Sequence, residues 1–274
     1  MFNKYLIVAS KKDRAGINIT TQLSQFRENP LLSSMKDAPS FDFYLCDEEI
    51  IFTENLDKEK ISRYDFVIFA SKHQSEAGGK TLSVHAPGNW RQNEFGGEPE
   101  KICPTSSQFL KQIFEKLKAN AEESHLDYEV TLECTHHGPL IDKPCVFIEI
   151  GATPTEWEDR RAGFAVAKTI RDIIKDFKPN PYSENAVAIG GPHYCPNFNK
   201  IQLNSNLAIS HIIPQYSLPL TENMVREAIE KTQEEIDFAL LDWKGLGNAE
   251  SRKQVTEILD KLYIRYKRTS EIEK

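Results

Sequence analysis

Residues 66–76 read FVIFASKHQSE, an apolar run that passes directly into polar residues. A short run of branched and aromatic residues such as FVIFA (66–70) is typical of a strand buried on both faces. The runs YLIVA (5–9) and CVFIEI (145–150) show the same pattern. Further strands are predicted at 43–46, 128–133, 186–189 and 207–213.

Amphipathic stretches separate these strands. In residues 106–122 the apolar side chains recur at helical spacing, and a second helix begins near Pro154 and runs to Phe177. Thr221 is expected to cap a third helix that continues to about Leu240, and a last helix covers roughly 249–268. Alternating strands and helices predict an α/β fold in which helices cover both faces of a mostly parallel sheet.

One domain over 1–274 is the preferred division, because the sequence has no internal repeat, low-complexity tract or Gly/Ser linker. The one long irregular region, 71–104, is rich in Gly, Pro, Asn and His. Long loops in compact domains are commonly lids or binding loops. We therefore expect residues 71–104 to form a functional loop.

The composition is that of an ordinary soluble globular protein, with 39% hydrophobic and 27% charged residues. A net charge of -7 argues against indiscriminate nucleic-acid binding, although a local basic face stays compatible with it. Five cysteines without a CxxC pair argue against a disulfide framework and predict a reducing, cytoplasmic compartment. The N-terminal apolar run lacks a cleavage site and no stretch approaches the ~20 residues of a membrane span, so we expect no membrane association.

Histidines gather at or near the ends of the predicted strands. Ligands in open α/β sheets bind beyond the carboxyl ends of the strands, so a shared pocket is expected there. Two carboxylates have similar positions, Glu149 at the end of CVFIEI and Glu156 in GATPTEW. The six histidines are His73, His85, His136, His137, His193 and His211.

Imidazoles with carboxylates suit zinc, which activates water and polarises an ester carbonyl. Each residue alone also fits a structural role: a loop or core histidine satisfied by the backbone, or a strand carboxylate paired with Lys or Arg. Cys134 and Cys195 lie near histidines and are alternative nucleophiles. No GxSxG, HExxH, GxGxxG or P-loop motif is present, which favours attack by water over a covalent acyl-enzyme.

At these same residues the sequence resembles the archaeal-type D-aminoacyl-tRNA deacylases, which also occur in plants. The matching segments occur in order along nearly the whole chain. They are SKKDRAGINI (10–19), SKHQSEAGGKTLSVHAPGN (71–89), THHGP (135–139), EIGATPTEW (149–157), GGPHYCP (190–196), HIIPQY (211–216) and DWKG (242–245).

The resemblance implies a three-layer α/β/α, phosphorylase/hydrolase-like fold, related in architecture to peptidyl-tRNA hydrolase and to zinc-dependent exopeptidases. It implies a monomeric or weakly associating enzyme that binds zinc and hydrolyses the ester of D-aminoacyl-tRNA, releasing the D-amino acid and tRNA. We expect His73, His85, Glu149 and Glu156 to be catalytic, and His136 and His137 to hold zinc. The expected substrate-binding residues are Lys72, Ser75, Lys80, Asn89, Arg91, Gly138, His193 and His211.

Docking of tRNA needs a cationic rim. Lys72, Lys80 and Arg91 are the first candidates for the acceptor end. Two sets of basic residues are candidates for holding the acceptor stem. For the second set, a solvated helix face without a role in binding is the favoured interpretation. These sets are Arg160, Arg161 and Lys168, and Lys261, Arg265, Lys267 and Arg268.

Other functions stay open on the sequence alone. A zinc aminopeptidase or amidohydrolase would turn over aminoacyl amides without RNA. A non-catalytic RNA-binding module would show neither zinc nor a pH-dependent rate, and a nucleoside phosphorylase lacks support because no phosphate-binding signature is present.

Overall fold

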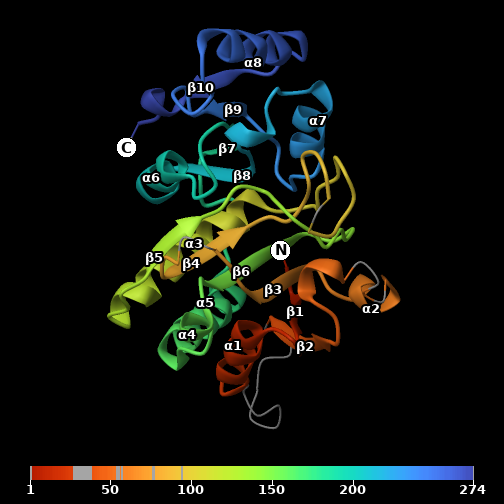
Figure 1. The fold of residues 1–274 in the computed structure, drawn as a ribbon, viewed down its shortest axis with the longest axis vertical. Helices are drawn as coiled ribbons and strands as arrows, with labels where there is room; N and C mark the ends of the chain where they lie inside the picture. Colours follow the sequence, from red (N-terminus) through yellow and green to blue (C-terminus); the bar gives the residue numbers. More distant parts are fainter. Residues whose placement is uncertain are drawn as a thin grey trace.

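The computed structural model describes residues 2–26, 39–53, 56, 58–75, 78–93 and 95–273, and its strands form two sheets (Figure 1). The larger sheet has the order β2-β1-β3-β6-β4-β5. All of its pairings are parallel except that of β4 with β6, which confirms a mostly parallel mixed sheet. Its strands are β1 (Lys4–Ser10), β2 (Ser40–Cys46), β3 (Phe66–Lys72), β4 (Thr81–His85), β5 (Glu129–Leu132) and β6 (Cys145–Gly151).

A second, four-stranded sheet has the order β10-β9-β7-β8, which the sequence analysis does not predict as a separate sheet. In Figure 1 it lies above the six-stranded sheet, with α8 beyond it. Its strands are β7 (Glu184–Ile189), β8 (Leu207–Ile213), β9 (Phe238–Leu241) and β10 (Tyr266–Arg268). One hydrophobic core contains residues of both sheets, such as Ile148 and Ile209, so the sheets are packed together. The division into one domain stays a prediction.

Helices α1 (Arg14–Ser24), α3 (Ser107–Glu123) and α5 (Arg160–Asp176) cover one face of the larger sheet. Side chains alternate between the faces of a strand, and Leu82 and Val84 of β4 join this helix-covered core. On the other face, Val67, Phe69 and Phe147 pack with the short helices η1 (Ile50–Phe52) and α2 (Lys58–Ser62). The remaining helices are α4 (Pro154–Trp157), α6 (Pro196–Asn204), η2 (Gln215–Ser217), α7 (Glu222–Glu230), α8 (Ala249–Lys261) and η3 (Thr269–Glu271).

The structure corrects three expected elements. Residues 71–104 are not uniformly irregular, because β4 lies among them. The helix capped by Thr221 ends at Glu230, since the buried run FALL (238–241) pairs as β9. The last helix ends at Lys261 and is followed by β10.

The expected helix from Pro154 to Phe177 is two helices. Asp159 lies between α4 and α5, and its side chain accepts hydrogen bonds from the backbone N–H groups of Arg161 and Ala162. A new helix therefore begins at Arg160. In the described part of the chain, no helix has both the length and the apolar character needed to cross a membrane.

Candidate active site

Polar side chains occupy part of the sheet face that α1, α3 and α5 leave uncovered. Glu149 of β6 lies opposite Ser83 of β4, and the backbone N–H of Glu133, just after β5, donates to the carbonyl oxygen of Val84. Because Leu82 and Val84 face the helix-covered core, the alternate residues Ser83 and His85 face the other side. The sequence analysis expects Glu149 beyond a common row of strand carboxyl ends. Glu149 and Glu133 instead lie on a sheet face. The reason is that β4 and β5 run antiparallel to β6.

Each of these carboxylates contacts several imidazoles. Glu133 Oε1 is 3.2 Å from His73 Nδ1, and Glu133 Oε2 is 3.2 Å from His193 Nε2 and 3.5 Å from His136 Nε2. Glu149 Oε2 is 3.6 Å from His73 Nδ1 and 3.5 Å from His85 Nε2. Two buried acids therefore connect histidines from four separate stretches of the chain.

The imidazole rings also lie against one another. The ring centre of His136 is 4.2 Å from that of His85, 4.3 Å from that of His137 and 4.6 Å from that of His193. The His85 side chain is 0% exposed, whereas those of His136 and His193 are 22% and 30% exposed. Solvent therefore reaches the cluster from the side of His136 and His193. The imidazole–carboxylate cluster is our name for Glu133 and Glu149 together with the five histidines His73, His85, His136, His137 and His193.

Electrostatics divide the histidines into two kinds. Burial opposes the charge of His73, but the nearby carboxylates of Glu133 and Glu149 outweigh it and raise the pKa of His73 to about 11. For Glu149, burial is outweighed by His73 and His85, so that its pKa falls to about 2. Burial lowers the pKa of His137 to about 4. At neutral pH the cluster thus combines a protonated His73, an ionised Glu149 and a neutral His137 with a free lone pair.

The cluster leaves buried polar atoms unsatisfied. Within the described residues, His85 Nε2, Glu133 Oε1 and Glu149 Oε2 have no hydrogen-bond partner, although charged groups lie nearby. Unsatisfied buried groups are rare in proteins and call for a specific reason, such as a bound ion. Ligand atoms of His85, Glu133 and Glu149 lie within 4.8 Å of one another, as do those of His85, His136 and His137. Imidazole nitrogens and carboxylate oxygens are suitable zinc ligands, so these residues fit a divalent cation.

Two predicted residues have contacts outside the cluster. His211 lies buried in β8, with Nδ1 3.2 Å from Thr135 Oγ1 and Nε2 3.4 Å from the carbonyl oxygen of Lys231. Glu156 accepts hydrogen bonds from the backbone N–H and hydroxyl of Thr153, at 3.1 and 2.6 Å, and so closes the first turn of α4. These contacts give both residues structural roles, while the predicted roles in substrate binding and catalysis stay untested.

Three of the expected substrate-binding residues hold the surrounding loops. The Asn89 side-chain amide donates to the carbonyl oxygen of Gly96 at 2.7 Å, and the backbone N–H of Gly78 donates to that of Ser75 at 3.2 Å. A Cβ atom on Gly138 would lie 2.4 Å from the backbone nitrogen of Gly97, so only glycine allows this close approach.

The expected cationic rim is largely engaged with the protein itself. Lys72 Nζ is 3.4 Å from Glu49 Oε2, and Lys80 Nζ is 4.0 Å from Asp127 Oδ2. Arg91 donates from Nε to the carbonyl oxygen of Ser217 at 3.1 Å, and its guanidinium also donates to that of Pro219. Among the two acceptor-stem sets, Arg161 donates to Ser124, Lys168 and Lys267 pair with Glu123 and Glu184, and Arg268 lies over Trp243. The surface that docks tRNA stays a prediction.

Sequence reasoning missed Glu133, Tyr194 and Tyr216. Tyr194 Oη is 2.9 Å from His73 Nε2, and Tyr216 Oη is 2.9 Å from Cys134 Sγ. Glu133 could have been found from the alternation in EVTLE (129–133), where the polar residues fall on the strand face opposite Val130 and Leu132. The tyrosines carry no such signal, because their positions depend on tertiary contacts.

Comparisons with known proteins agree with the resemblance seen in the sequence. The family model described as D-aminoacyl-tRNA deacylase matches residues 61–267. Proteins named D-aminoacyl-tRNA deacylase from Methanosarcina acetivorans and Methanocaldococcus jannaschii are 35% and 32% identical to this chain. These matches cover 98% and 92% of this chain, and 94% of each relative.

A solved structure shares the whole fold. It is a crystal structure titled as the conserved protein of unknown function AF0625, with a TM-score of 0.86 and 29% identity. The match covers 98% of this chain and 96% of the other. The family model spans every member of the imidazole–carboxylate cluster. The chain therefore belongs to the D-aminoacyl-tRNA deacylase family.

Proposed function

We propose that this protein hydrolyses the ester bond of D-aminoacyl-tRNA at the imidazole–carboxylate cluster, releasing the D-amino acid and free tRNA. The observation that carries the proposal is the set of buried, unsatisfied atoms on Glu133, Glu149 and His85 in a member of this family. Most buried polar groups in proteins are paired, and three unpaired atoms here lie within one cluster.

The chemistry required is modest, because an aminoacyl ester is already activated. Ionised Glu133 or Glu149 accepts a proton from the attacking water, and both lie within reach of the His73 imidazole. Protonated His73, which these acids hold by Nδ1, stabilises negative charge or protonates the departing ribose oxygen. Tyr194, at 2.9 Å from His73 Nε2, orients the ring.

We propose zinc as the metal, held by His85, His136 and His137 together with a carboxylate of Glu133 or Glu149. When bound, it would polarise the ester carbonyl and lower the pKa of a water molecule. His136 and His137 suit this role because burial lowers the pKa of both, which keeps their lone pairs free at neutral pH.

The partner is the acceptor end of tRNA, and chirality would be read by clashes that an L-residue suffers. We also propose a cytoplasmic location, because all five cysteines are free and buried. A monomer stays the predicted state.

The test follows ester loss from D-tyrosyl-tRNA and L-tyrosyl-tRNA with metal-loaded protein, with and without a chelator. We expect rapid loss of the D-ester only, abolished by the chelator and restored by zinc. Persistence of both esters would contradict the function, and a rate that resists chelation would remove zinc from it. Turnover of aminoacyl amides without RNA would favour the aminopeptidase alternative.

A further inference from the structure

Tyr216 is an exposed residue whose hydroxyl group contacts two side chains at the cluster. The residue is 63% exposed, yet its Oη lies 2.9 Å from Cys134 Sγ and 3.4 Å from His193 Nδ1. Burial also raises the pKa of the Tyr216 hydroxyl above its ordinary value. The polar end of the side chain is therefore anchored at the cluster, while much of the aromatic ring faces solvent.

The backbone that carries Tyr216 is held on both sides. The N–H of Gln215 donates to the carbonyl oxygen of Gly191 at 2.9 Å, which ties the segment to the turn before His193. The N–H of Ser217 donates to the carbonyl oxygen of Pro214 at 3.0 Å, and Arg91 donates to that of Ser217. The ring is thus positioned before any ligand arrives, which lowers the entropic cost of binding.

The Tyr216 ring lies next to the solvent-exposed side of the cluster. The side chain of His193, which contacts the Tyr216 hydroxyl, is 30% exposed. In an aminoacyl-tRNA the ester is on the ribose of the terminal nucleotide, so the nucleobase of that nucleotide must lie just outside the catalytic groups. Its flat face and the tyrosine ring would then be neighbours.

We propose that the Tyr216 ring is a stacking platform for the terminal nucleobase of the tRNA substrate. The inference rests on the proposed function, whose substrate it places. Base–aromatic stacking is worth about 1–3 kcal/mol per base and tolerates different sequences. Such a platform binds the 3′ end that all tRNAs share and leaves the amino acid to be read by the cluster.

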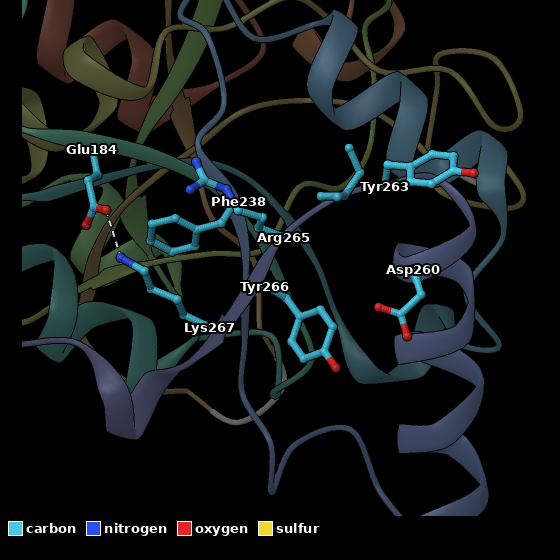
Figure 2. Close-up of a pocket in the computed structure, with 8 residues that line it drawn as sticks. Glu184, Phe238, Asp260, Tyr263, Arg265, Tyr266 and Lys267 are labelled. Atoms are coloured by element: carbon cyan, nitrogen blue, oxygen red, sulfur yellow. Dashed lines mark hydrogen bonds and ion pairs between the residues drawn. The ribbon is translucent and has the colours of Figure 1, made fainter.

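A second exposed tyrosine provides the matched control. Tyr263 is 94% exposed and lies in the chain between α8 and β10, two elements that Figure 1 shows away from β4 and β5. With Tyr266, Asp260 and Lys267 it lines a separate hollow of ≈ 570 Å³ (Figure 2). Loss of the Tyr263 ring removes at least as much exposed aromatic surface as loss of the Tyr216 ring, at a distance from the cluster in the sequence and the fold.

The experiment compares Tyr216→Leu, Tyr216→Phe and Tyr263→Leu. KM and kcat are measured with D-tyrosyl-tRNA, and Kd with uncharged tRNA. We expect Tyr216→Leu to raise KM and Kd by about 5- to 150-fold, which corresponds to the stacking energy. Tyr216→Phe keeps the ring and should keep KM and Kd near the wild-type values, as should Tyr263→Leu.

Two results would overturn the inference. One is an unchanged KM and Kd in a folded Tyr216→Leu protein, with folding verified by thermal unfolding. The other is a Tyr216→Phe protein as impaired as Tyr216→Leu, since the hydroxyl contact with Cys134 or His193 would then matter and not the ring. If the wild type leaves D-tyrosyl-tRNA intact, the proposed function fails, while Kd for uncharged tRNA still decides the stacking.

Discussion

Buried histidines occupy two environments in this protein, one in the imidazole–carboxylate cluster and one in β8. His211 in β8 has both ring nitrogens near polar partners, the hydroxyl of Thr135 and the carbonyl oxygen of Lys231. His85 in β4 is equally buried, but its Nε2 has no hydrogen-bond partner among the described residues. Both histidines come from strand-end motifs in the sequence, so sequence position alone does not separate them.

The contrast shows how a functional site differs from a satisfied core. A buried polar group without a partner costs about 1–3 kcal/mol, and a charged one costs more. His211 avoids that cost through neutral, local contacts. Glu133 Oε1 and Glu149 Oε2 have no hydrogen-bond partner among the described residues, which fits a site that binds a ligand or a metal ion.

The largest effect is expected for Glu149→Gln, which removes a charge from the cluster and keeps the size of the side chain. We expect kcat for D-tyrosyl-tRNA to fall by about 10²- to 10⁴-fold, the usual contribution of acid–base groups. Steady-state kinetics after zinc loading would measure it. A variant with wild-type kcat would show that Glu149 is only a strand carboxylate.

A smaller effect, on stability, is expected for His211. Burial lowers its pKa to about 4, so the folded state resists a proton that the unfolded state accepts below its pKa of about 6.5. The neutral His211 ring therefore contributes to the free energy of unfolding above pH 6.5. This contribution falls by about 3 kcal/mol as the pH is lowered towards 4.

Denaturant unfolding of wild type and His211→Gln between pH 7 and pH 4 measures this loss. The free-energy difference between the two proteins should shift by that amount in favour of the variant at low pH. Parallel pH profiles would show that His211 is not held neutral by the fold.

The smallest effect is expected for Arg91→Ala. Arg91 donates to the carbonyl oxygens of Ser217 and Pro219, and each such hydrogen bond is worth about 0.5–1.5 kcal/mol. If it acts by holding Tyr216, KM should rise by about two- to tenfold in the wild-type background, and hardly at all in Tyr216→Leu. Equal effects in both backgrounds would instead indicate a direct contact with tRNA.

The sequence predicts the continuous apolar strands well and the amphipathic one poorly. FVIFA (66–70) and CVFIEI (145–150) lie within β3 and β6, because strands buried on both faces are apolar throughout. Thr81–His85 escapes notice since only Leu82 and Val84 face the core, within a region rich in Gly and Pro. The strand FALL (238–241) was included in a helix because short apolar runs do not reveal their period.

Five of the six histidines lie together in the cluster, as the sequence analysis expects, and His211 is the exception. Their arrangement on a sheet face could not be predicted, because it depends on the antiparallel pairing of β4 with β6. Glu133, which contacts three of the imidazoles, was visible in the alternation of its strand. Its significance becomes clear only when the partner strand is known.

The most direct test of the cluster as the hydrolytic site compares Glu133→Gln with His211→Gln in single-turnover hydrolysis of D-tyrosyl-tRNA, under conditions where both variants are folded. Glu133→Gln removes a buried acid from the cluster. His211→Gln replaces a buried histidine whose two ring nitrogens already have polar partners. We expect Glu133→Gln to lower the rate by about 10²- to 10⁴-fold, as for Glu149→Gln, and His211→Gln to retain a rate near that of the wild type. An active Glu133→Gln protein, or an inactive His211→Gln protein, would contradict the account.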